Sequence, residues 1–281
     1  SVRMNYLSDP NMIATLKDDN KAYISRYALG KDYHKIIRKK LGSLTKKIAE
    51  EIPKEQFNHR PFVDSAPVLE KPLAEQAGLG WIGKNTLLID KSVGSWFFLG
   101  EIYTSIPLPV DNAKEANLCG KCKACMSVCP TNAFPEPYVL DAKKCISYQT
   151  IENKGIIPKE LRSPMGNRVF GCDDCQIWCP WNRDPAITSE EVFQPRHKLD
   201  NASLLELFNW SESEFQEKTL GSPIRRIGYE RWLRNLAIGL GNAPGCSNIV
   251  KSLKARAVNS SEMLKEHLHW ALEEQNRKLN N

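Results

Sequence analysis

The sequence predicts an α+β fold in which a mixed N-terminal domain and a helical C-terminal domain flank a short cysteine-rich segment. Three observations support this prediction. Strand and helix patterns alternate over the first 110 residues, eight of the nine cysteines lie between Cys119 and Cys179, and helical periodicity returns from Leu204 onward. The 281 residues are enough for two domains or three small ones, and we place the boundaries at residues 1–110, 111–190 and 191–281.

The N-terminal domain opens with residues 1–7, which resemble the end of a strand. Residue 1 is a serine, so we expect the natural N-terminus and the first elements to be missing. The elements that we then predict, in chain order, are a helix over 21–50, an extended segment over 60–69, a short helix over 73–77, a glycine-rich loop over 78–85, and two strands over 86–90 and 95–103 that form a hairpin or lie side by side in a sheet.

The composition indicates an ordinary globular protein. Hydrophobic residues make up 41% and charged residues 26% of the chain, and no apolar run approaches the roughly 18 residues needed to span a bilayer. We therefore expect no membrane insertion. The formal net charge of +6 permits a polyanionic partner without requiring one. Cysteines crowded into one segment favour metal binding in a reducing compartment, so we expect a cytoplasmic protein.

The cysteine-rich segment contains the run Cys119-x2-Cys122-x2-Cys125-x3-Cys129-Pro130. This spacing is typical of bacterial ferredoxins, in which three cysteines bind one four-iron cluster and the fourth binds a second cluster. A shorter run, Cys172-x2-Cys175-x3-Cys179-Pro180, and the intervening Cys145 complete eight ligands. If the last cysteine of each run binds the other cluster, one cluster lies on Cys119, Cys122, Cys125 and Cys179, and the other on Cys129, Cys145, Cys172 and Cys175.

Two alternatives remain open for the cysteines. Cys-x2-Cys pairs also bind zinc, so two zinc sites are a competing interpretation of the same residues. Cys246 stands apart from the others, and we expect it to be a buried structural thiol.

Outside the cysteines, Asp64 lies in an apolar extended segment, where burial would raise its pKa and make it a candidate general acid. A turn-forming or helix-capping aspartate is the alternative. Lys71 and Lys84 are candidates for binding phosphate or carboxamide groups, or are ordinary surface lysines. His34 faces either a ligand or solvent. The basic cluster of Arg225, Arg226, Arg231 and Arg234 contacts a phosphate backbone or forms a solvated helix face.

The ordered combination of motifs resembles the epoxyqueuosine reductase family, cobalamin-dependent iron–sulfur enzymes of queuosine tRNA modification. The segments that carry the resemblance are the cysteine runs and residues 25–35, 63–71, 80–86, 94–101, 138–141, 145–148, 165–168, 171–176, 233–235 and 240–242.

The resemblance implies a cobalamin-binding domain of nitroreductase-like fold, a ferredoxin-like domain with two [4Fe-4S] clusters, and a HEAT-like helical domain that binds tRNA. It implies reduction of epoxyqueuosine to queuosine at the wobble position, with cob(I)alamin receiving electrons from the clusters. The implied partners are a tRNA and a low-potential electron donor, and a monomer is expected.

The resemblance also implies roles for individual residues. Asp64 matches the proton donor of the family, and Lys71 stands where members often carry arginine. The residues expected to contact cobalamin are Asp64, Lys71, Asn85, Thr86, Ser147 and Asp173. This chain lacks about a quarter of the usual family length at its start, so part of the cobalamin pocket is expected to be absent.

Three competing functions share some of these features. A reductive dehalogenase also uses cobalamin and two clusters but is typically exported and lacks the helical tRNA platform. An electron-transfer subunit would bind no corrinoid. A corrinoid activator would bind a partner protein in place of tRNA.

Overall fold

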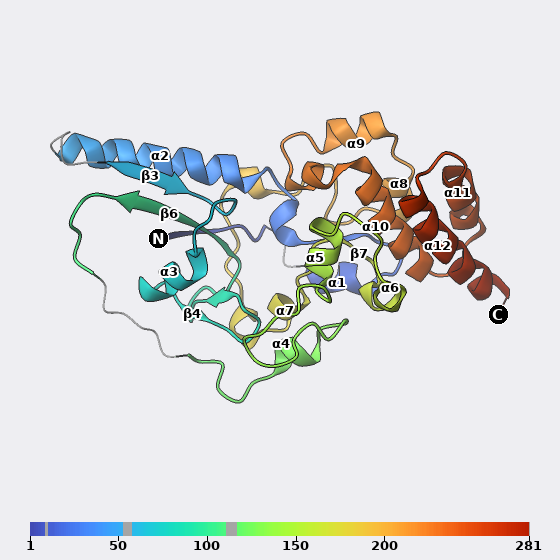
Figure 1. Ribbon diagram of the computed structural model, residues 1–281, viewed down its shortest axis with the longest axis horizontal. Coiled ribbons are helices and arrows are strands. Elements are labelled where there is room, and N and C mark those ends of the chain that lie inside the picture. Colours follow the sequence, from blue (N-terminus) through green and yellow to red (C-terminus); the bar gives the residue numbers. More distant parts are fainter. Residues whose placement is uncertain (9–10, 53–57, 111–116, 281) are drawn as a thin grey trace.

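The N-terminal part is built on a three-stranded antiparallel sheet with the order β1-β6-β3. The computed structural model describes residues 1–8, 11–52, 58–110 and 117–280 (Figure 1). The strands are β1 (Val2–Asn5), β3 (His59–Phe62) and β6 (Phe97–Thr104), and β6 lies in the middle, with Met4 opposite Phe98 and Phe62 opposite Glu101. The expected strand at residues 1–7 is therefore confirmed.

Two helices cover this sheet. Helix α2 (Tyr33–Glu51) packs against β6 through Ile37 and Leu41, which lie next to Gly100. Helix α3 (Glu70–Gln76) contacts β6 as well and lies away from α2 in Figure 1. The sheet thus holds the start of α2 and the loop that follows β3 close to each other.

The predicted helix over residues 21–50 is correct only from Tyr33 onward. Residues 21–32 contain strand β2 (Tyr23–Ile24) and a 3-10 turn (Arg26–Ala28), and α2 begins after Asp32. The Asp32 carboxylate accepts a hydrogen bond from the His34 backbone N–H, which caps the helix. Helical periodicity cannot show this boundary because apolar residues also fill the buried strand before it.

The predicted pairing of residues 86–90 with 95–103 is wrong. Strand β5 (Leu88–Ile89) pairs with β4 (Trp81–Ile82), which lies inside the expected glycine-rich loop. Strand β6 pairs instead with β1 and β3. An isolated bridge between Asp90 and Gly94 closes the turn between the two segments. The Asp90 side chain accepts hydrogen bonds from Ser92, which makes a tight turn that directs β6 into the other sheet.

The cysteine-rich segment consists of short elements, as expected. They are α4 (Ala124–Ser127), α5 (Ile146–Ile151), α6 (Lys159–Met165), β7 (Arg168–Phe170), α7 (Asp174–Ile177) and a 3-10 turn (Pro180–Asn182). Strand β7 pairs with β2 in parallel, so this segment is joined to the N-terminal part by backbone hydrogen bonds.

Helices make up the C-terminal part. They are a 3-10 turn (Glu191–Phe193), α8 (Leu204–Phe208), α9 (Glu212–Lys218), the 3-10 helix η5 (Pro223–Ile227), α10 (Gly228–Asn242), α11 (Ser247–Ala257) and α12 (Glu262–Asn280). Helix α1 (Met12–Lys17) belongs to the N-terminal part. Every residue of α10 from Trp232 to Gly241 is buried. This central helix packs most extensively against α12.

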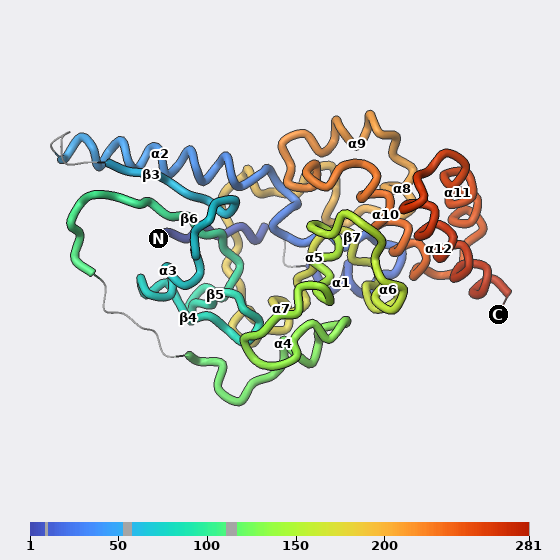
Figure 2. Tube along the Cα trace, in the orientation of Figure 1, coloured from blue at the N-terminus to red at the C-terminus, as the bar shows by residue number. Residues whose placement is uncertain are grey.

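The main hydrophobic core joins all three parts of the chain. Ile24, Phe170 and Leu236 belong to one buried cluster. Figure 2 shows the corresponding arrangement, in which α5, α6 and β7 lie beside α10. The proposed domain boundaries stay a prediction, and the shared core means that the three parts support one another. None of the helices in the described ranges is long and apolar enough to cross a membrane.

Candidate functional site

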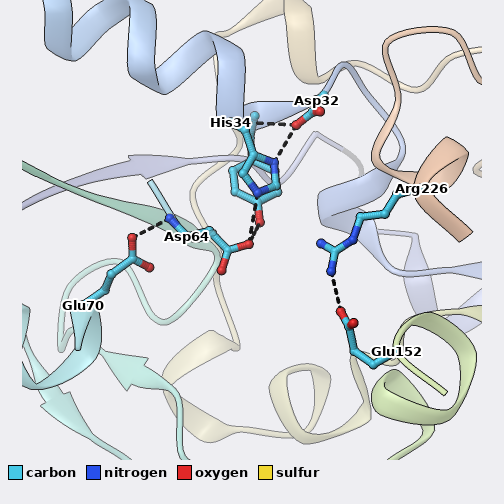
Figure 3. A network of polar contacts seen from close by, with 7 residues as sticks. Asp32, His34, Asp64, Glu70, Glu152 and Arg226 are labelled. Carbon is cyan, nitrogen blue, oxygen red and sulfur yellow. Dashed lines mark hydrogen bonds and ion pairs between the residues drawn. The ribbon is translucent and has the colours of Figure 1, made fainter. Parts of the chain in front are cut away.

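A pocket of about 180 Å³ lies where the N-terminal part meets α5 and η5 (Figure 3). It brings together side chains that are far apart in the sequence. The lining residues are Tyr27, Tyr33, His34, Asp64, Ser147, Ile151, Glu152, Phe170, Pro223 and Arg226.

Asp64 lies on the loop between β3 and α3 and reaches this pocket. Its backbone has a φ of 50°, a left-handed conformation that is unusual for a residue other than glycine. The Asp64 backbone N–H donates a hydrogen bond of 2.5 Å to Oε1 of Glu70, at the start of α3. The loop conformation that presents the Asp64 carboxylate is thus held by a charged acceptor.

The Asp64 carboxylate is hydrogen-bonded to two consecutive residues of α2. Its Oδ2 accepts the Tyr33 hydroxyl and lies 3.2 Å from Nε2 of His34. The other ring nitrogen of His34, Nδ1, is 2.7 Å from Oδ1 of Asp32, the residue that caps α2. The helix cap therefore fixes the imidazole, and the imidazole links two carboxylates (Figure 3).

The prediction that burial raises the Asp64 pKa is wrong. Its side chain is 49% exposed, and hydrogen bonds from His34 and Tyr33 lower its pKa. Hydrogen bonds to Asp32 and Asp64 raise the pKa of His34 to about 9. At neutral pH the proton of this pair therefore resides on the imidazole. Of the two alternatives for His34, a ligand site or bulk solvent, the structure favours the first, because His34 lines the pocket.

A second charged pair stands on the opposite wall of the pocket. Arg226 of η5 donates to Oε1 of Glu152, which follows α5, over 2.6 Å, and both side chains are about half exposed. The positive charge of Arg226 also helps to lower the Asp64 pKa. Sequence reasoning placed Arg226 in a basic cluster and missed Glu152, because nothing in the local sequence marks that residue.

Two arginines of the predicted basic cluster, Arg231 and Arg234, are engaged within the protein. Arg234 is fully buried and donates to the carbonyls of Gln149, Asn153 and Gly155. Arg231 donates to backbone carbonyls as well, including that of Ile151. The interpretation of these two arginines as phosphate contacts or as a solvated face is wrong, since they tie the helices to the α5 segment.

The predicted first set of cysteines surrounds an apolar cavity of about 240 Å³. Burial raises the pKa of the Cys125 thiol to about 11, and the nearby thiols of the same set add to this shift. Lys84 supports the wall by donating to the carbonyls of Gly120 and Cys122, so it is neither a phosphate ligand nor a surface lysine. The cavity is lined by Lys84, Asn85, Ile89, Leu118, Cys119, Cys122, Cys125, Cys179, Pro180 and Trp181.

The other four cysteines, Cys129, Cys145, Cys172 and Cys175, are all half-buried. Burial raises the pKa of Cys145, Cys172 and Cys175, and Cys145 is close enough to Cys129 and to Cys175 for their charges to interact. In the parts of the chain that the structure describes, no three His, Cys, Asp or Glu side chains form a group suited to a single metal ion. Sulfurs spread around a cavity fit a cubane, and the division into two sets stays a prediction.

Cys246 lies apart from both sets. It precedes α11, where its backbone N–H donates to the side chain of Gln275. Cys246 is half-buried, whereas the sequence predicts a buried thiol.

The residues expected to contact cobalamin fall into two groups. Asp64 and Ser147 line the pocket, and Lys71 donates to the carbonyl of Thr86 over 2.7 Å on a neighbouring loop. Asn85 and Asp173, in contrast, use their side chains inside the protein. Two of the six predicted residues, Asp64 and Ser147, therefore line this pocket, and the cobalamin contacts stay a prediction.

Asp173 is the more deeply buried of these two. Its carboxylate accepts hydrogen bonds from the Tyr23 hydroxyl, the Ser25 hydroxyl and the Arg26 backbone N–H, at 2.5–2.8 Å. Burial raises its pKa. These contacts join β2 to the segment that carries Cys172 and Cys175. A direct contact with a cofactor stays a prediction for Asp173, and its observed contacts are structural.

Two family models match this chain. Residues 1–65 match the model described as epoxyqueuosine reductase QueG, and residues 118–182 match the 4Fe-4S double cluster binding domain. The match to a double-cluster domain favours iron–sulfur clusters over the zinc alternative.

Curated proteins and solved structures agree with these matches. The epoxyqueuosine reductases of Pseudomonas aeruginosa and Escherichia coli K12 are 60% and 54% identical to this chain, over 97% and 98% of it and over 75% and 72% of their own lengths. The structure of an epoxyqueuosine reductase with an epoxyqueuosine-modified tRNA-Tyr stem loop superposes with a TM-score of 0.87 at 27% identity, over 99% of this chain and 76% of that one. A Bacillus subtilis epoxyqueuosine reductase, in which an aspartate-bearing catalytic loop is swung out of the active site, gives 0.86 at 27% identity, over 99% and 76%.

Proposed function

This chain belongs to the epoxyqueuosine reductase family, and we propose on that basis that it reduces epoxyqueuosine to queuosine at the wobble position of tRNA. The observation that supports the proposal most directly is the Asp32–His34–Asp64 chain of hydrogen bonds, which ends in a pocket beside the cysteine-rich segment.

The reaction removes an epoxide oxygen and leaves an alkene. Both carbon–oxygen bonds break, two electrons and two protons are consumed, and water is released. Side chains supply no electrons, so iron–sulfur clusters held by the cysteines of residues 118–182 would supply them. A bound cobalamin would supply a strongly reducing centre able to attack the epoxide carbon, and Asp64 and Ser147 are the residues of this pocket best placed to face it.

Protons come from the Asp64–His34 pair in this proposal. A negative charge that develops on the epoxide oxygen needs a donor in the pocket, and the imidazolium of His34 holds a proton at neutral pH. The imidazolium transfers this proton to the ionised Asp64 carboxylate, which passes it on to the oxygen, and solvent restores the proton on His34 for the second protonation. Asp32 keeps the ring oriented throughout, because its carboxylate binds the other ring nitrogen.

The tRNA partner is proposed to bind across the pocket entrance. Arg225 and Arg226 on η5 are exposed, whereas Arg231 and Arg234 are occupied within the protein. A wobble base turned out of its stack would enter the pocket, as in other enzymes that modify bases. The low-potential electron donor, the monomeric state and the cytoplasmic location remain predictions.

The decisive experiment is an anaerobic assay with a defined substrate. The purified chain is reconstituted with iron, sulfide and cobalamin and then incubated with an epoxyqueuosine stem–loop and a chemical reductant. Conversion to queuosine, followed by mass spectrometry of the nucleosides, supports the proposal. Corrinoid binding without conversion, or reduction of a halogenated substrate in its place, overturns it.

A further inference from the structure

We infer that Glu152 and Arg226 recognise the Watson–Crick edge of the wobble base, so that the pocket selects a guanine-like base before the epoxide is reduced. The inference rests on the proposed function, and it assigns a specificity role to the wall opposite Asp64.

The placement of the two charged pairs supports this assignment. Asp64 and His34 lie on one side of the pocket and Glu152 and Arg226 lie on the other (Figure 3). The hydrogen bond between Glu152 and Arg226 uses one carboxylate oxygen and one guanidinium nitrogen. Among the described residues, this 2.6 Å contact is the only side-chain hydrogen bond that either group makes, and both side chains are half exposed. They can therefore bind a further polar partner.

The chemistry of the substrate matches these two groups. Epoxyqueuosine contains a 7-deazaguanine whose Watson–Crick edge offers two neighbouring N–H donors and one carbonyl acceptor. A carboxylate accepts from both donors, and a guanidinium donates to the carbonyl. Glu152 and Arg226 provide this complement side by side.

The direction of the substituent gives a second argument. The epoxide-bearing group is attached to the five-membered ring, on the side of the base away from its Watson–Crick edge. When the epoxide lies at Asp64, that edge must point away from Asp64. Glu152 and Arg226 occupy the wall in that direction. The apolar side chains of Ile151, Phe170 and Pro223 also line the pocket and offer surfaces for the faces of the base.

The test measures binding of anticodon stem–loops that differ only at the wobble base. Guanosine and inosine differ by the exocyclic amine, which is one of the two donors assigned to Glu152. Dissociation constants for both loops are measured at one salt concentration, with the cluster-loaded protein and with Glu152→Gln. Glu160→Gln is the matched control, because Glu160 is exposed on α6 and lies outside the pocket.

Wild type is expected to bind the guanosine loop at least tenfold more tightly than the inosine loop, since a hydrogen bond to a charged group contributes about 1.5–3 kcal/mol. Glu152→Gln should reduce this ratio to less than about threefold, whereas Glu160→Gln should preserve it. Arg226→Ala should instead weaken the preference for guanosine over adenosine, which lacks the carbonyl. Arg225→Ala is its comparison, because Arg225 neighbours Arg226 without lining the pocket, so its loss should weaken binding of both loops equally and leave the preference unchanged.

Several results would overturn the inference. One is a wild-type protein that does not distinguish guanosine from inosine. Another is a Glu152→Gln protein that keeps the ratio but loses affinity for the epoxyqueuosine loop alone, because this would place Glu152 at the amine of the substituent. Conversion of epoxyqueuosine without base discrimination sinks only the inference. If the protein distinguishes guanosine from inosine through Glu152 but does not convert epoxyqueuosine, the inference is supported and the proposed function is wrong. If the protein binds none of the loops, both are wrong.

Discussion

The cysteine cavity and the Asp64 pocket are assembled in different ways. The eight predicted ligands lie between Cys119 and Cys179, and local turns present them, such as the hydrogen bond from the Cys122 N–H to the Cys119 carbonyl. The walls of the pocket come instead from the start of α2, the loop after β3, α5 and η5. One centre is therefore specified by spacing along the chain, and the other by tertiary packing.

The pKa shifts in the two centres also have different origins, local in the cysteine cavity and tertiary in the Asp64 pocket. Burial raises the pKa of the Cys125 and Cys175 thiols, and neighbouring thiols add to the rise. In the pocket, hydrogen bonds from the α2 residues lower the pKa of Asp64 in spite of its partial burial. The comparison teaches that the chemistry of a metal centre can be recognised from a motif, whereas the protonation state of a pocket depends on partners that a motif does not name.

The largest expected effect is the loss of a cluster. Cys125→Ser should halve the iron content, from about eight to about four atoms per chain, and reduce turnover more than about 1000-fold because electron delivery stops. Iron and sulfide analysis together with EPR of the reduced protein measure this. Cys246→Ser is the control and should leave the iron content unchanged.

The same variants test the crossed assignment of ligands. Cys179→Ser should remove the same EPR signal as Cys125→Ser, and Cys129→Ser should remove the other one. Loss of the same EPR signal in Cys125→Ser and Cys129→Ser would contradict the crossed assignment. It would mean that all four cysteines of the first run bind one cluster.

Asp64→Asn should lower turnover by about 100- to 10,000-fold, because the group that passes the proton to the leaving oxygen is lost. Affinity for the substrate stem–loop should change less than about threefold, since the side chain shape is preserved. Single-turnover rates and binding isotherms separate these two quantities. Asp184→Asn, an exposed aspartate outside the pocket, is the control. Full turnover of Asp64→Asn with clusters and cobalamin in place would remove Asp64 from the proton path.

His34→Gln should reduce turnover by about 10- to 100-fold and change its pH dependence. The His34 pKa is raised from 6.5 to about 9, so the wild-type rate should fall as pH rises through about 9 and the proton is lost. The variant should lack this alkaline decline.

The same shift predicts how stability depends on pH. The folded pKa lies above the unfolded value, so the stabilisation from His34 is complete below pH 6.5 and is lost as pH rises through about 9. Thermal midpoints should therefore fall more between these pH values in wild type than in His34→Gln. His269→Gln, on the exposed face of α12, is the control and should behave as wild type.

The sequence predicts the cysteine-rich segment better than the Asp64 pocket, and the reasons are physical. The cysteine spacing predicts a double-cluster segment because ligand geometry is local, and the proline after each run marks a turn. Asp64 lines the pocket and its role as general acid stays a prediction, but the predicted rise of its pKa is wrong because the partner that decides it, His34, lies on another element. Arg234 was misplaced on a surface because an arginine in a helix pattern gives no sign of the carbonyls it will meet.

The support of the pocket wall can be tested through Arg234. It donates to carbonyls of the α5 segment, which carries Ser147 and Glu152, and burial lowers its pKa to about 10. Arg234→Met should destabilise the protein by about 3 kcal/mol, because buried carbonyls lose their donor. Urea unfolding measures this, with Arg225→Met expected within about 0.5 kcal/mol of wild type. A neutral effect of Arg234→Met would mean that the wall does not depend on this contact.

The smallest expected effect concerns the Asp64 loop. Glu70 accepts the Asp64 backbone N–H, and Glu75, one turn later on α3, accepts the backbone N–H of Ile82. Glu70→Gln replaces a charged acceptor by a neutral one, which weakens this hydrogen bond by about 1 kcal/mol and should lower turnover about threefold to fivefold. Glu75→Gln makes the same chemical change away from Asp64 and should leave turnover unaltered. Because the loop must keep a left-handed residue in place, equal rates for the two variants would mean that the backbone holds Asp64 without Glu70.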